Sequence, residues 1–69
     1  MKYRQYDKVK LKDGTIGVLI EVFSNGDYMF EFPVYSENDF IDNGVRYCDY
    51  DDKIINETEI DTFIERAGK

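Results

Sequence analysis

The chain has 69 residues and a formal net charge of −6, with no histidine and one cysteine, Cys48. A chain of this length builds one domain with a modest core, which leaves little room for an enclosed active site. Without histidine it lacks the commonest general base, and a lone cysteine excludes an internal disulfide, so we expect no enzyme.

The sequence shows no signal for membrane insertion or secretion. No apolar run approaches the roughly 20 residues of a membrane span, and no apolar stretch follows the first residues as in a signal peptide. An unpaired cysteine is typical of a reducing compartment. The acidic residues lack the spacing of a calcium-binding loop. We therefore expect a cytoplasmic protein with a reduced thiol and without metal, cofactor or membrane contact.

Charge is divided unevenly along the chain. Residues 1–35 carry five basic and five acidic side chains, whereas residues 36–69 carry four basic and ten acidic ones. An acidic half repels the phosphates of nucleic acids and of membrane surfaces. It indicates either a surface that serves solubility or a face that meets a basic protein.

The first predicted elements are two strands. In residues 6–12, Val9 and Leu11 alternate with lysines, the pattern of a half-buried strand. Asp13-Gly14 is a strong turn signal. Residues 15–23 are rich in β-branched side chains and continue as a second strand. Gly17 interrupts that strand, and we interpret it as a bend of the sheet rather than a ligand contact.

The middle of the chain predicts two more strands and a long loop. After a turn at residues 24–27, residues 28–32 form a third strand, which Pro33 ends or places at an edge. Residues 34–44 are polar and acidic and predict the longest loop. Residues 45–50 predict a fourth strand, residues 51–53 a turn, and residues 54–55 the stub of a fifth.

The end of the chain predicts a short helix over about residues 57–67. Asn56 can cap it, and Glu59 stands at the third helical position, as in a capping box. An apolar stripe then follows at helical spacing, made of Ile60, Phe63, Ile64 and Ala67. This helix would dock on the sheet, because about ten residues are marginal as a helix alone.

Residues 6–32 resemble the first hairpins of the small SH3-like β-barrels. The run from Tyr6 to Val22 has their valine-containing first strand, short turn, glycine and long second strand, and residues 25–32 have their next turn and aromatic–acid alternation. Similar short proteins occur in bacteria, some beside toxin genes or on mobile elements. The resemblance implies a mainly β protein: one domain over residues 1–69, a five-stranded antiparallel SH3-like barrel followed by the C-terminal helix. It implies no particular function.

We expect this protein to bind another protein through an acidic, aromatic-rich surface. The sequence has more aromatic residues than a small core can bury, and tyrosine suits surfaces that are part apolar and part wet. The role would be that of an immunity, antitoxin or inhibitor protein with a basic partner. Phe40 is either an anchor or a lid folded over the barrel. The predicted partner-binding residues are Tyr35, Asp39, Phe40, Asp42, Tyr47, Tyr50, Asp51 and Asp52.

Two alternatives stay open. The first is a nucleic-acid-binding barrel that uses an N-terminal strip of basic and aromatic residues, although the net charge of −6 opposes it. That strip consists of Tyr3, Tyr6, Lys8, Lys10 and Lys12. The second is an accessory structural domain with no discrete site.

Overall fold

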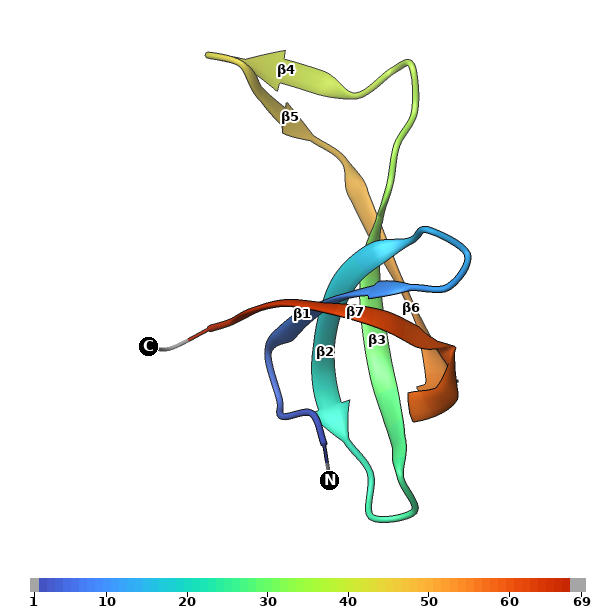
Figure 1. Ribbon diagram of the computed structural model, residues 1–69. Coiled ribbons are helices and arrows are strands. Elements are labelled where there is room, and N and C mark those ends of the chain that lie inside the picture. Colours follow the sequence, from blue (N-terminus) through green and yellow to red (C-terminus); the bar gives the residue numbers. More distant parts are fainter. Residues whose placement is uncertain (1, 68–69) are drawn as a thin grey trace.

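The computed structural model describes residues 2–67 and shows a mainly β protein, as predicted. Five strands form one antiparallel sheet in the order β6-β3-β2-β1-β7, and two short strands form a separate hairpin (Figure 1). The strands are β1 (Asp7–Leu11), β2 (Ile16–Val22), β3 (Asp27–Val34), β4 (Phe40–Asp42), β5 (Val45–Tyr47), β6 (Asp49–Asn56) and β7 (Ile60–Arg66).

The core lies on one face of the five-stranded sheet. β1, β2 and β3 turn alternate side chains to that face, whereas β6 and β7 each add one buried residue. The N-terminal segment adds Tyr3, whose ring meets that of Tyr28 edge to face at 6.0 Å. The Tyr28 hydroxyl donates to Glu57 at 3.3 Å, and burial raises its pKa. The buried apolar residues are Tyr3, Val9, Leu11, Leu19, Tyr28, Phe30, Ile55 and Ile60.

At Gly17, β2 packs closely against β3. A Cβ atom there would collide with the carbonyl oxygen of Glu31 and with the ring of Phe30. Only glycine therefore lets β2 lie against β3 at this point. Gly17 thus has a packing role, whereas the irregularity of the β2–β3 pairing lies further along, between Leu19 and Glu21.

The five antiparallel strands are present as predicted, but within residues 2–67 they form an open sheet, so the prediction of a barrel was wrong. β6 and β7 are the two edges, and each pairs on one side only, β6 with β3 and β7 with β1. Within residues 2–67 no strand joins these edges to each other. β6 pairs with β3 over eight residues, from Val34↔Asp49 to Asp27↔Asn56, and only the 3-10 turn at residues 57–59 connects it to β7.

The prediction of a helix over residues 57–67 was also wrong. The capping box at Asn56 and Glu59 is present, but it closes only a three-residue 3-10 turn, Glu57–Glu59, and β7 follows. A short helix would have left the backbone groups of β1 unpaired on one side, whereas a strand pairs with them. Tertiary pairing thus overrides the helical spacing of the apolar residues, and of the predicted stripe only Ile60 is buried.

The loop predicted over residues 34–44 is present only over residues 35–39, and the turn prediction for residues 51–53 was wrong. Residues 40–47 form the hairpin β4–β5, and residues 51–53 lie inside β6. Asn43 and Gly44 both have positive φ, at 52° and 79°, which is the geometry of a tight two-residue hairpin turn. Pro33 stays in β3 opposite Tyr50, beyond Glu31, the last residue that β3 pairs with β2. It therefore lies at a local edge of the sheet.

Candidate interaction surface

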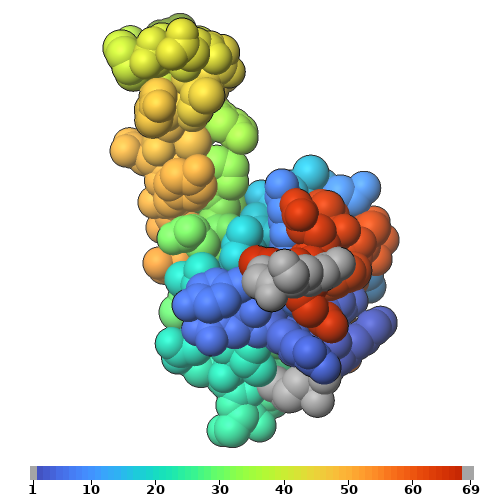
Figure 2. All heavy atoms as spheres, turned by 90° about the vertical axis from the view of Figure 1, so that its left-hand side faces the viewer, coloured from blue at the N-terminus to red at the C-terminus, as the bar shows by residue number. Residues whose placement is uncertain are grey.

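The outer part of the β3–β6 hairpin projects from the rest of the molecule. β3 stops pairing with β2 after Glu31, so the chain from there outward is a two-stranded ribbon that ends in β4 and β5. We call residues 33–52 the arm and the rest the body; at the base of the arm, Asp51 and Asp52 pair with Phe32 and Glu31 of the body. Figure 1 shows the arm rising from the sheet, and Figure 2 shows it as a narrow column beside the rounded body. The molecule measures 38 × 25 × 18 Å as a result.

The arm exposes large apolar side chains. Tyr35, Phe40, Tyr47 and Tyr50 are each between 56% and 67% exposed. The Phe40 and Tyr47 rings face each other across the β4–β5 hairpin with centroids 5.8 Å apart. The neighbouring exposed apolar residues of the arm are Val34, Ile41 and Val45. Because exposed apolar patches in proteins often mark interaction sites, the arm is the strongest candidate surface.

Arg46 holds the arm together. Its Nε donates to the Asp39 carboxylate at 2.9 Å, its Nη2 donates to the Ser36 carbonyl at 2.7 Å, and its guanidinium lies 4.9 Å from the Tyr35 ring centroid. The backbone N–H of Ser36 also donates to Asp39, and together with Arg46 it lowers the pKa of that carboxyl. These contacts order residues that sequence alone predicted to be a loop.

The arm is also the most acidic part of the chain. Residues 33–52 contain six acidic side chains and one basic one, a net charge of −5 out of −6 for the whole protein. Asp39 is engaged by Arg46, whereas Asp42, Asp49, Asp51 and Asp52 are exposed. The apolar side chains therefore stand in a strongly negative rim, an arrangement that suits a positively charged surface.

The eight predicted partner-binding residues are distributed along the arm. Phe40, Asp42 and Tyr47 lie on the β4–β5 hairpin, Tyr35 and Asp39 lie between β3 and β4, and Tyr50, Asp51 and Asp52 lie on β6. The lid interpretation of Phe40 was wrong, since its side chain is exposed on β4. The prediction missed Arg46 and Val45. The signal for the hairpin that presents them was Asn43-Gly44, the strongest short hairpin motif, whereas Arg46 has no local signal.

A groove lies where the arm meets the body. It encloses about 440 Å³ on the sheet face opposite the core. Its apolar wall is formed by Ile16, Val18, Pro33, Tyr35 and Tyr50, with Lys8 and Glu31 beside them. Tyr35 and Tyr50, two of the predicted residues, therefore belong both to the exposed surface of the arm and to the wall of this groove.

The N-terminal strip does not form the surface that nucleic-acid binding would need. Tyr3 lies in the core, so it cannot stack on a base. Lys8 and Lys10 lie 4.0 and 3.8 Å from carboxylates of β7, those of Glu65 and Asp61. Tyr6 and Lys12 are exposed but lie at opposite ends of β1. The five residues therefore offer one exposed ring and partly compensated charge.

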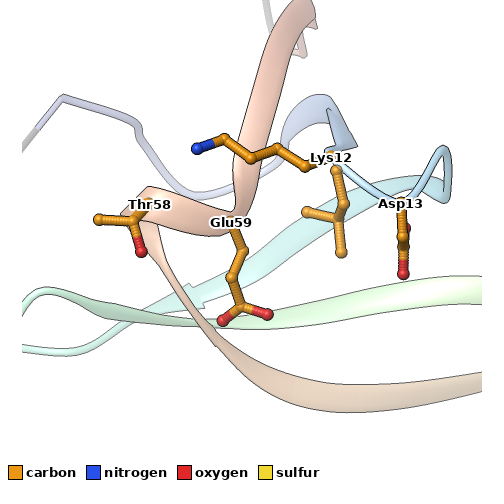
Figure 3. Close-up of a pocket in the computed structure, with 5 residues that line it drawn as sticks. Lys12, Asp13, Thr58 and Glu59 are labelled. Atoms are coloured by element: carbon orange, nitrogen blue, oxygen red, sulfur yellow. The ribbon is translucent and has the colours of Figure 1, made fainter.

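A second hollow lies between two turns, and the structure of these turns explains the carboxylates around it. Figure 3 shows it between the β1–β2 turn and the 3-10 turn, with the Lys12 side chain extending toward Thr58 and Glu59. It encloses about 230 Å³. The Glu59 carboxylate accepts from the Asn56 backbone at 2.8 Å, and Asp13 accepts from the Thr15 backbone at 2.9 Å, which lowers the pKa of Asp13. These carboxylates stabilise the two turns, which accounts for their presence.

Within residues 2–67 no three cysteine or acidic side chains gather as metal ligands do. Over the same span no helix has the length and apolar character needed to cross a membrane. Cys48 is a half-buried free thiol between β5 and β6. No family model, curated protein or solved structure matches this chain.

Proposed function

We propose that this protein is a non-enzymatic interaction module that binds a basic protein partner through its arm. The observation that carries the proposal is the set of exposed aromatic side chains on a projecting, internally braced hairpin with a net charge of −5. Tyrosine and phenylalanine gain most on binding when they are buried in a partner's pockets. The acidic rim steers a positively charged partner and excludes an acidic one.

The bracing of the arm supports binding rather than mere solubility. A solubilising tail needs charge but no order, whereas Arg46 fixes Ser36, Asp39 and Tyr35 in one arrangement. A surface that is ordered before binding loses less conformational entropy on complex formation. An immunity, antitoxin or inhibitor role would use such a surface to cover the basic site of another protein. That role takes place in the cytoplasm in our proposal, which the single free cysteine supports.

The likeness of residues 6–32 to SH3-like barrels belongs to the same proposal. β1, β2 and β3 follow one another as antiparallel neighbours, which is compatible with the first three strands of such a barrel. In this proposal the arm is an elaboration of the hairpin between β3 and β6, and it gives this protein a surface of its own.

The test is quantitative capture of binding proteins from a bacterial lysate, followed by affinity measurement with the purified partner. We expect Phe40→Ser and Tyr47→Ser each to weaken binding by about tenfold, because both remove an apolar anchor. Ile64→Ser is the matched control, since Ile64 is an exposed apolar residue on β7 of the body. It should bind as the unaltered protein does.

Equal binding by the two arm variants and by the control would reject the arm as the contact surface. The nucleic-acid alternative is tested in the same series with single-stranded DNA and RNA at about 50 mM salt. A mobility shift that salt abolishes, and that Lys8→Ala and Lys12→Ala weaken, would favour that alternative over a protein partner.

A further inference from the structure

The outer edge of β6 is an eight-residue strand edge without a partner. β6 pairs with β3 on one side, and within residues 2–67 no strand lies on its other side. Seven of its eight side chains are exposed, and only Ile55 is buried. A strand edge of this length presents a row of backbone donors and acceptors to any extended chain that can approach it.

Three observations identify which backbone groups face outward. Pro33 has no N–H, so the Pro33↔Tyr50 pair cannot be one of the hydrogen-bonded pairs of the β3–β6 ladder. Pairs alternate along an antiparallel ladder, so the N–H and C=O groups of Tyr50, Asp52, Ile54 and Asn56 point away from β3. In agreement, the N–H of Asp52 donates to Asp51 and that of Asn56 donates to Glu59, both at 2.8 Å.

The charge of this edge restricts what can bind to it. Asp49, Asp51 and Asp52 lie within four residues of each other, and Lys53 is the one basic side chain of the strand. Two copies of this edge would bring like charges together, which opposes self-association. The Asp51 carboxylate also occupies the N–H of Asp52, which discourages pairing until an opposite charge draws that carboxylate away.

We propose that the outer edge of β6 accepts an extended, lysine- or arginine-bearing segment of a partner protein as a sixth strand of the sheet. The inference rests on the proposed function, because it names how the basic partner is held. The N–H and C=O groups of Tyr50 and Ile54 pair with the incoming backbone. The basic side chains of that segment lie beside Asp49 and Asp51, and its apolar side chains lie beside Tyr50 and Ile54 on the opposite face.

The test uses an eight-residue synthetic peptide of alternating threonine and lysine, titrated into the full chain at low salt. Backbone amide hydrogen exchange is followed by NMR. With nine-tenths of the protein bound, exchange at Tyr50 and Ile54 should slow about tenfold, because only the unbound tenth exchanges freely. The same peptide methylated on every backbone nitrogen keeps its charges and its carbonyl acceptors. Its N-methyl groups cannot donate and would collide with the outward carbonyls of Tyr50 and Ile54, so it cannot pair as a strand and should leave exchange at both residues unchanged.

The variant Asp51→Asn tests the contribution of the edge's negative charge to peptide binding. It should weaken that binding about two- to fivefold, as expected for a surface ion pair. Asp42→Asn is the matched control, because it removes the same charge from β4 and should leave affinity within error. Equal losses in both variants would mean that net charge alone attracts the peptide, and they would overturn the inference.

The inference about the β6 edge and the proposed function of the arm can be refuted independently of each other. No peptide binding at millimolar concentration, or binding that perturbs Phe40 and Tyr47 but not the Tyr50 and Ile54 amides, overturns the edge inference and leaves the proposed function intact. Slowed exchange at Tyr50 and Ile54 without peptide, rising with protein concentration, would show a second copy at the edge and would also overturn it. Slowed exchange on peptide addition supports the edge even if the Phe40 and Tyr47 variants bind a protein partner normally.

Discussion

Arg66 donates to both oxygens of the buried Asp7 carboxylate, at 2.9 and 3.1 Å, although 59 residues separate them. The backbone N–H of Arg4 donates to the same carboxylate at 2.9 Å. Asp7 is fully buried, whereas the Arg66 side chain keeps about a third of its surface in water. The pair therefore joins the first strand to the last at the end of the sheet where the chain enters it.

Removing the Asp7 charge should destabilise the protein. Asp7→Asn weakens the hydrogen bonds from Arg66 and Arg4, and we expect a loss of about 2 kcal/mol in the free energy of unfolding. Arg66→Met should cost more, because it leaves a buried carboxylate without its counter-charge. Urea denaturation of both variants measures which of them loses more of the free energy of unfolding. A smaller loss for Arg66→Met than for Asp7→Asn would contradict this account of the pair.

The same pair predicts how stability depends on pH. Arg66 above all lowers the pKa of folded Asp7 below its ordinary value of 3.8. Above that value both folded and unfolded Asp7 are ionised, and the contribution of the pair to stability is complete. As the pH falls below it, the unfolded state takes up a proton first, so stability declines until the folded pKa is passed.

Unfolding free energies measured between about pH 5 and pH 2 should therefore decline more steeply for the natural protein than for Asp7→Asn. The carboxyls of Asp13 and Asp39 also have lowered pKa values and act in the same window. The unfolding free energies of Asp13→Asn and Asp39→Asn, measured over the same pH range, therefore serve for comparison with those of Asp7→Asn. Parallel curves for the natural protein and Asp7→Asn would show that the buried carboxylate is not the group that titrates.

Gly17→Ala should disturb the core. The added methyl group meets the Glu31 carbonyl and the Phe30 ring, and overpacking of this kind typically costs about 1–3 kcal/mol. Gly26→Ala is the control, because a Cβ there meets no atom within 4 Å and only the positive φ is strained. Its cost should be about 1 kcal/mol. Thermal unfolding distinguishes the two, and a Gly17→Ala protein as stable as the natural one would contradict the close approach of β2 to β3.

Arg46→Met should loosen the arm while the body keeps its stability. The variant loses the contacts to Asp39 and Ser36, and none of the eight core residues lies in the arm. Amide exchange should accelerate between residues 36 and 47 and stay unchanged in β1 and β2. Lys12→Met removes the same charge from the body and should leave exchange in the arm unaltered. Unchanged arm exchange in Arg46→Met would mean that the β4–β5 pairing alone orders the arm.

The first half of the fold could be predicted from the sequence because its signals are local. The alternation of Val9 and Leu11 and the turn at Asp13-Gly14 each lie within a few residues of the structure that they determine. Residues 60–66 could not be assigned in this way. Their apolar spacing fits a helix, and what makes them a strand is the open side of β1 together with the pairing of Arg66 with Asp7, both distant in sequence.

The candidate surface was predictable in its composition but not in its shape. An excess of aromatic residues and the acidity of the second half pointed to Tyr35, Phe40 and Tyr47. That they share a projecting hairpin follows from Asn43-Gly44, a local signal, and from Arg46, which bridges ten residues to Ser36. The unpaired edge of β6 depends on the order of strands in the sheet, which no local pattern specifies.

The chain leaves the sheet at Val34 and returns at Asp49, two residues that face each other across one rung of the β3–β6 ladder. Whatever joins these two positions closes the same hairpin, so the length and sequence of residues 35–48 can change while the body keeps its register. A library of alternative hairpins could be grafted there onto a constant scaffold. In such a library the choice of binding partner would vary independently of the ability to fold.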